Sequence, residues 1–121
     1  MRAGSPLKRL VRDDATRIAK TESLFRDVNE RIAESASGVG LPDAVFVCEC
    51  ADPTCTDRLT VDLDEYEQVR GEATHFLLAP GHEVSSVEQI VARRRGYQIV
   101  RKVEQAVAAV VRRLNPRRDP A

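Results

Sequence analysis

The chain has 121 residues, the usual size of a single domain, and its 42% hydrophobic residues can bury only a small core. Its 19 basic residues balance its 19 acidic ones, which excludes a histone-like polycation and an acidic disordered tail. No apolar run reaches the roughly 18 residues of a membrane span, and none follows the first basic residues as a secretory signal requires.

The N-terminal third of the chain predicts one long helix. Residues 1–14 include glycine, serine and proline among several charges, so we expect a flexible basic segment there. Over residues 15–36, apolar residues recur at steps of three and four and form one stripe: Ile18, Leu24, Phe25, Val28 and Ile32. This helix is expected to cover a small sheet, and an exposed part of the stripe can serve a dimer as readily as a core.

Two further helices are predicted from capping boxes, in which an N-cap residue is followed by glutamate three residues later. Asp62 and Glu65 open a helix that ends near residue 70. Ser85 and Glu88 open another, which Gly96 ends, so that the arginines of residues 93–95 lie at its C-terminal end. Spaced valines predict a last helix over residues 107–114.

Short strands are predicted where β-branched and aromatic residues lie between turn signals, at residues 44–48, 58–61, 75–79 and 97–103. Together these elements predict an α+β fold, in which a long N-terminal helix accompanies a small sheet of short strands. We expect one domain over residues 15–114, between the flexible segment of residues 1–14 and a loose tail of residues 115–121.

All three cysteines lie in one short segment with the spacing C-x-C-x4-C. In an extended strand, residues two apart point to the same side, so Cys48 and Cys50 project together and Glu49 points away. The Asp-Pro turn that follows can bring Cys55 back to the same place. In a reducing compartment, clustered cysteines indicate metal or redox chemistry more often than disulfides.

A fourth ligand would close a tetrahedral site around a metal. His82 follows a glycine, which permits a tight turn that can aim the imidazole at a fixed point, and His75 is the chemical alternative. Three thiolates and one imidazole suit Zn²⁺, with bonds of about 2.3 Å to sulfur and about 2.0 Å to nitrogen. The sequence therefore predicts a zinc site that contributes to the stability of a small core.

Two other interpretations of the cysteines remain open. Buried cysteines can act as small hydrophobic residues, although Cys48 and Cys50 flank a charged residue and precede a polar turn. They can also carry redox chemistry. A disulfide between Cys48 and Cys50 would close a strained small ring, and Cys55 could serve as a resolving partner.

Five segments carry a resemblance to a known family: F-R-D-V-N-E-R-I (25–32), F-V-C-E-C-A-D-P-T-C (46–55), L-D-E-Y-E-Q-V-R (63–70), F-L-L-A-P-G-H-E (76–83) and V-E-Q-I-V (87–91). Together they resemble an uncharacterised family of small, mostly actinobacterial proteins, over about residues 21–102. The resemblance implies that Cys48, Cys50, Cys55 and His82 belong together, and it implies a residue other than histidine at the position of His75. It implies no activity.

Charge is divided along the chain, with a net +4 over residues 1–20, −9 over residues 21–75 and +5 over residues 76–121. Either the basic ends fold against the acidic middle, or they offer a surface to an acidic or phosphate-bearing partner. Nucleic acid is the weaker alternative, because the net charge is zero and only 4% of residues are aromatic.

The function predicted from these features is that of an interaction or regulatory module with a structural Cys3His zinc site. No catalytic or cofactor-binding residues are predicted, because a site rich in thiolates is a poor Lewis acid and only two histidines are present. A redox sensor that releases zinc on thiol oxidation is the alternative. We expect a cytoplasmic protein that binds a protein partner. The sequence identifies neither this partner nor the oligomeric state.

Overall fold

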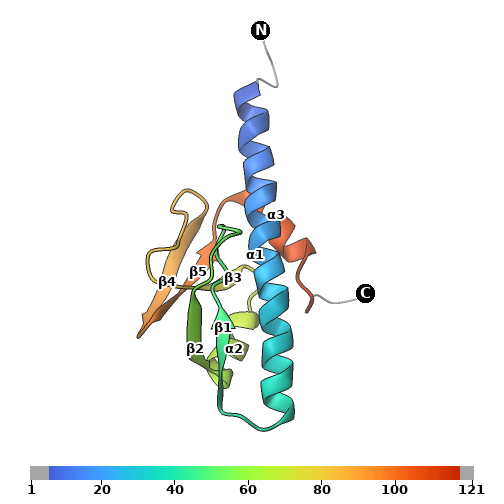
Figure 1. Ribbon diagram of the computed structural model, residues 1–121. Helices are drawn as coiled ribbons and strands as arrows, with labels where there is room; N and C mark the ends of the chain where they lie inside the picture. The colour runs from blue at the N-terminus through green and yellow to red at the C-terminus, as the bar shows by residue number, and fades with distance from the viewer. Residues whose placement is uncertain (1–5, 118–121) are drawn as a thin grey trace.

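The computed structural model describes residues 6–117, and the side chains from residue 14 onward. In chain order the elements are α1 (Pro6–Gly38), β1 (Asp43–Val47), β2 (Arg58–Asp62), α2 (Leu63–Arg70), β3 (His75–Leu78), β4 (Glu88–Arg94), β5 (Tyr97–Lys102) and α3 (Gln105–Arg113). Figure 1 shows α1 along one side of the molecule, with the strands on the other and α3 beside it. The predicted α+β class with a long N-terminal helix is confirmed.

Helix α1 is longer than the sequence indicated. It begins at Pro6 rather than near residue 15, since proline is well suited to the first helical position, and residues 6–14 are therefore helical. Residues 1–5, which belong to the predicted flexible segment, lie outside the described part of the chain. No helix within residues 6–117 has the length and hydrophobicity needed to cross a membrane.

The face that α1 buries differs from the predicted apolar stripe. Leu24 is 61% exposed and Val28 is 40% exposed. The buried positions instead recur along a neighbouring face and carry small or polar side chains: Ala15, Ala19, Glu22, Ser23, Arg26, Asn29, Ala33 and Ala36. The helix therefore docks mainly through alanines and specific polar contacts. Of the predicted stripe, Ile18 and Ile32 pack partly against the core, whereas Leu24 and Val28 stay exposed.

The strands form two antiparallel sheets, one of β1 and β2 and the other in the order β3–β5–β4. Alternate residues of the β1–β2 hairpin face the core, among them Phe46, Leu59 and Val61. Phe46 stacks on Tyr66 of α2 with ring centroids 4.4 Å apart. The predicted N-cap of α2 is present, because the Asp62 carboxylate accepts hydrogen bonds from the backbone N–H groups of residues 64 and 65.

The helix predicted to begin at Ser85 is wrong, because residues 88–94 form strand β4. One turn does form, in which Val84 C=O accepts from the N–H groups of Val87 and Glu88, and the Glu88 side chain accepts from Val84 N–H. The turn ends there because the following residues pair with β5, and Gly96 at φ +86° turns the hairpin. Arg93 and Arg94 thus belong to a strand and not to a helix end.

The segment after α3 is packed against the body, in contrast to the predicted loose tail. Asn115 is buried and accepts a hydrogen bond from Arg70. Arg117 pairs with both Glu30 of α1 and Glu67 of α2, at 2.8 Å and 2.7 Å. Residues 118–121 lie outside the described part of the chain, so the prediction for the tail is tested only up to residue 117.

Candidate metal centre

Four side chains converge at one end of the β1–β2 hairpin. The ligand atoms of Cys48, Cys50, Cys55 and His82 all lie within 4.8 Å of one another. Cys48 and Cys50 follow β1, Cys55 lies in the loop before β2, and His82 lies in the turn after β3. The structure therefore brings together all four residues that the sequence analysis singled out, from segments as far as 34 residues apart.

Backbone hydrogen bonds hold the first two cysteines in place. Cys48 N–H donates to Asp57 C=O at 3.1 Å, which continues the β1–β2 pairing by one residue. Glu49 N–H then donates to Leu77 C=O at 2.8 Å, which ties the loop to β3. As a result, the cysteines at positions 48 and 50 lie where the small β1–β2 sheet meets the three-stranded sheet.

The return of Cys55 depends on a turn closed by Asp52. The Asp52 carboxylate accepts from Thr54 N–H at 2.9 Å and from the Thr54 hydroxyl at 2.7 Å. Cys55 N–H donates to Asp52 C=O at 3.0 Å. This side-chain-closed turn is the type that Asp-Pro-Thr favours, and it places the third thiol beside the first two.

His82 is aimed by a tight turn that requires glycine. Gly81 has φ +83°, a conformation that other residues rarely adopt, and His82 N–H donates to Ala79 C=O at 3.2 Å. The ring Nδ1 then lies 3.5 Å from Cys48 Sγ and 3.6 Å from Cys55 Sγ. His75, the alternative fourth ligand, is a partly buried residue of β3 outside this group.

Two of the separations between ligand atoms match those of a tetrahedral metal site. With metal–sulfur bonds of about 2.3 Å and metal–nitrogen bonds of about 2.0–2.1 Å, tetrahedral angles place sulfur and nitrogen about 3.6 Å apart. The two measured Sγ–Nδ1 distances are 3.5 Å and 3.6 Å. The donor set and its geometry thus fit one metal ion, and its chemistry of three sulfurs and one nitrogen favours a soft or borderline cation.

Two groups outside the cluster contact its candidate ligands, the Asp57 carboxylate and the Ala79 N–H. His82 Nε2 lies 3.2 Å from the Asp57 carboxylate, so that the ring can donate there while Nδ1 faces the sulfurs. Ala79 N–H donates to Cys48 Sγ at 3.1 Å, which stabilises negative charge on that sulfur. Sequence analysis missed Asp57, because nothing in the spacing shows that the start of β2 lies beside the turn at residues 80–82.

Burial affects the protonation of Cys48 and Cys50. Cys48 and Cys50 are buried, whereas Cys55 and His82 are partly exposed. Loss of hydration raises the pKa of the Cys48 thiol and also that of the Cys50 thiol, because a buried thiolate is costly without a compensating charge. A bound cation would supply that charge.

Glu49 points away from the cysteines, as predicted, but it enters the core. Its carboxylate is fully buried and accepts from Asn29 of α1 at 2.7 Å and from Leu77 N–H of β3 at 3.0 Å. The residue between two candidate ligands therefore anchors the loop to a helix and to the second sheet. Sequence analysis missed this role, although a charged residue that follows a run of apolar residues is a signal of it.

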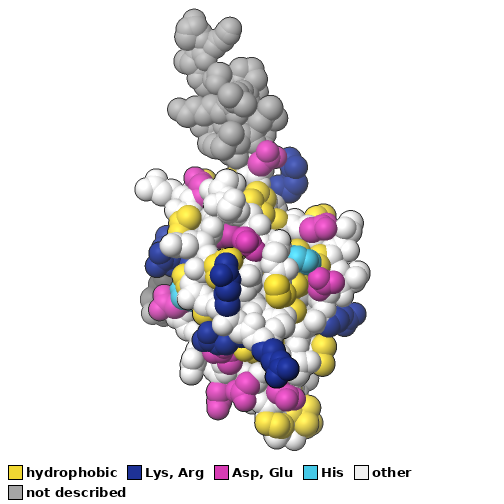
Figure 2. Space-filling view, turned by 90° about the vertical axis from the view of Figure 1, so that its left-hand side faces the viewer, with side chains coloured by type: hydrophobic (Ala, Val, Ile, Leu, Met, Phe, Trp, Pro, Cys, Tyr) yellow, Lys and Arg dark blue, Asp and Glu magenta, His cyan; other side chains and the backbone are white. Residues whose placement is uncertain are grey.

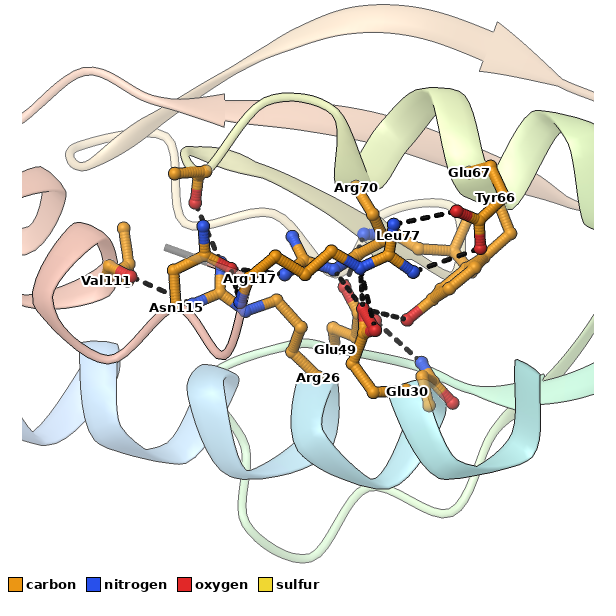
Figure 3. Close-up of polar contacts among 12 residues, drawn as sticks. Arg26, Glu30, Glu49, Tyr66, Glu67, Arg70, Leu77, Val111, Asn115 and Arg117 are labelled. Atoms are coloured by element: carbon orange, nitrogen blue, oxygen red, sulfur yellow. Dashed lines mark hydrogen bonds and ion pairs between the residues drawn. The ribbon is translucent and has the colours of Figure 1, made fainter. Parts of the chain in front are cut away.

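A buried polar network surrounds Glu49 between α1, α2 and α3 (Figure 3). Arg70 Nε donates to the Glu30 carboxylate at 2.8 Å. Arg26 donates to the backbone C=O groups of Ala73 and Val111, at 2.7 Å and 2.9 Å. Tyr66 and Arg70 are both buried, so their shared helical face serves the core and not an exposed surface.

Several basic side chains near the C-terminal end are used within the molecule. Arg94 pairs with Glu65 at 2.6 Å, Arg117 pairs with two glutamates, and Lys102 is buried between Glu22 and Glu88. Figure 2 shows acidic and basic side chains interleaved on one face of the molecule. These contacts favour the intramolecular explanation of the charge pattern over a surface for nucleic acid.

Comparison of the chain with protein-family models, with curated proteins and with solved structures finds no match. The fold and the site therefore define the class of protein by themselves. This is a small α+β protein with a Cys3His group that could hold a metal ion.

Proposed function

We propose that Cys48, Cys50, Cys55 and His82 bind one Zn²⁺ as a structural site, and that the chain acts as a non-enzymatic interaction or regulatory module in the cytoplasm. The observation that carries the proposal is the convergence of four ligand atoms within 4.8 Å, with sulfur–nitrogen distances of 3.5 Å and 3.6 Å. Thiolate ligands with one imidazole favour zinc among the common biological cations.

A structural role is supported by the number of ligands. Four protein ligands complete a tetrahedral zinc shell. They leave no position for a reactive water, whereas catalytic zinc sites keep such a position open. The ion would join the loop after β1 to the turn after β3, which are otherwise linked by the contacts of Glu49 with Leu77 and of Cys48 with Ala79. Metal binding would then contribute directly to the free energy of folding.

The test is the metal content of the protein by native mass spectrometry, after anaerobic purification without chelator. We expect one tightly held zinc per chain. The variant Cys50→Ser should lose the metal and much of the fold, with a lowered melting temperature, and His82→Ala should lose most of its metal affinity. His75→Ala is the matched control, because it removes a histidine outside the group and should keep the zinc. A Cys50→Ser protein with the metal content and melting temperature of the wild type would refute the proposal.

A second candidate function is a redox sensor that uses the same residues. The observation that favours it is the partial exposure of Cys55 beside two other sulfurs. Peroxide could then oxidise two thiolates to a disulfide, with peroxide reduced to water and the zinc released. Stoichiometric zinc release by low peroxide, reversed by a thiol reductant, would support this function. Retention of zinc under the same treatment would argue against the redox function and leave the structural role as the only one supported.

A further inference from the structure

The outer edge of β1 is defined by the hydrogen bonds at the two ends of the hairpin. Leu63 N–H donates to Pro42 C=O at 2.9 Å, and Cys48 N–H donates to Asp57 C=O at 3.1 Å. Because hydrogen-bonded and non-hydrogen-bonded pairs alternate along an antiparallel ladder, the even-numbered residues of β1 bond to β2. The backbone groups of the odd-numbered residues therefore point away from β2.

Part of this edge is already satisfied within the molecule. Glu49 N–H bonds to β3, and the Asn29 side-chain amide bonds to both the N–H and the C=O of Val47, at 2.8 Å each. Asn29 thus takes the place of a neighbouring strand at that residue. The outward N–H and C=O groups of Asp43 and Val45 have no partner among the described residues, so the edge is open over a short stretch.

An apolar groove of about 1150 Å³ lies beside the open edge, between β1 and a flank of α1. It contains most of the large hydrophobic side chains that the fold leaves exposed: Leu24, Val28, Val39, Leu41 and Val45. Two residues of the lining, Asp27 and Asp43, are acidic, and Arg31 is basic. An open strand edge beside an exposed apolar surface is the usual form of a site for an added strand.

We propose that this groove and edge bind a second copy of the same chain, through antiparallel pairing of the two β1 strands. The pairing places Asp43 opposite the partner's Val45, and Val45 opposite the partner's Asp43. Both residues then use their outward N–H and C=O groups, which gives four hydrogen bonds across a two-fold axis. The register stops short of Val47, so the contacts of Asn29 remain intact.

The two-fold axis crosses the groove at the level of Ala44. Asn29 of α1 and Val47 of β1 are in contact and so lie at the same level. Three residues along β1 cover about 10 Å and reach Ala44. About seven residues along α1 cover the same distance, so Ala36 lies level with Ala44. At the level of Ala44, the axis lies about 12 Å along α1 from Val28 but only about 5 Å from Val39, so it is nearer the Val39–Leu41 end of the groove. The rotation places the partner's Val39 and Leu41 on the side of the axis that carries Val28.

Charge supports the same partner. Arg31 lies on one side of the axis and Asp43 on the other, so the two-fold rotation brings Arg31 toward the partner's Asp43, twice per dimer. An unrelated apolar peptide would use the edge and the groove, but it would leave Arg31 without this partner. The inference rests on the proposed function, which it extends by naming one partner of the module.

The experiment is sedimentation of the zinc-loaded full chain over a range of concentrations, with metal content and melting temperature measured on every variant. We expect a reversible dimer. Val45→Pro should weaken it at least about tenfold, because the N–H that is removed points outward and no bond to β2 is lost. Val28→Glu should do the same, whereas Val91→Glu is the matched control, since Val91 is similarly exposed at 43% but lies on β4.

A charge exchange tests the register. Arg31→Glu and Asp43→Arg should each weaken the dimer about fivefold, and the double variant should recover most of that loss because the pairs are restored with reversed sign. A chain that stays monomeric up to about 1 mM overturns the proposal, as does a dimer that Val45→Pro and Val28→Glu leave unchanged. A monomer whose groove binds an unrelated peptide also overturns it. Because metal content is measured separately, loss of zinc is distinguished from loss of the dimer.

Discussion

The buried carboxylate of Glu22 gives a prediction about the pH dependence of stability. Glu22, Glu88 and Lys102 are all buried between α1 and the three-stranded sheet, so two acids share one base. Lys102 Nζ lies 2.6 Å from Glu22 Oε1 and also contacts Glu88. Burial raises the pKa of Glu22 from 4.5 to about 8, against the opposing effect of the Lys102 charge.

The sign and size follow from this pKa. A folded-state pKa above the unfolded value gives stability that is complete below about pH 4.5 and is lost as pH rises toward 8. The loss amounts to at most about 5 kcal/mol, because each pKa unit corresponds to about 1.4 kcal/mol. Glu22→Gln mimics the protonated acid, so the variant should lack this loss and should gain stability over the wild type as pH increases.

The assay is urea unfolding of the wild type and Glu22→Gln between pH 5 and pH 9, where the difference between the two proteins isolates Glu22. Glu34→Gln is the matched control, since Glu34 is an exposed residue of the same helix, and its difference from the wild type should stay constant. If the free energies of unfolding of the wild type and Glu22→Gln remain parallel across this range, Glu22 is not protonated in the native state and the reasoning is wrong.

Two further predictions concern the supports of the candidate metal centre. Asn29→Ala removes both bonds to Val47 and one to buried Glu49, so we expect a loss of about 3 kcal/mol in urea unfolding, and a loss below about 1 kcal/mol would contradict this. Gly81→Ala forces a side chain into φ +83° and should cost about 1–2 kcal/mol with weaker zinc binding in a chelator competition. Gly38→Ala, at a helical position without positive φ, should leave zinc binding unchanged and should not lower stability, and equal effects of the two substitutions would count against the argument.

The cysteine segment could be read from the sequence because its geometry is local. The two-residue alternation at Cys48 and Cys50, and the side-chain-closed turn at Asp52, need no information about distant residues. The turn that aims His82 is also local, since Gly81 alone permits it. Which other residues would support these ligands depends on the packing of separate elements, and for that reason Asp57 was not found.

The errors arose where tertiary contacts outweighed local pattern. The spacing of Leu24 and Val28 predicted a buried stripe on α1, but the neighbouring face docks through Glu22, Arg26 and Asn29, whose partners lie far along the chain. A hydropathy pattern treats these residues as polar, so it cannot predict that they are buried against specific polar partners. Glu88 likewise satisfied a capping pattern, yet its strand is fixed by pairing with β5.

The placement of α1 has a consequence for the order in which the chain is made and folded. Arg26 bonds to Val111, a residue 85 positions later, and Glu22 meets Lys102 only when β5 has been synthesised. Helix α1 therefore lacks these two polar partners until β5 and α3 have been synthesised, although the partners of Asn29 in the β1 segment emerge much earlier. Complete docking of α1 should accordingly be a late step in folding, after the pairing of its C-terminal half with β1.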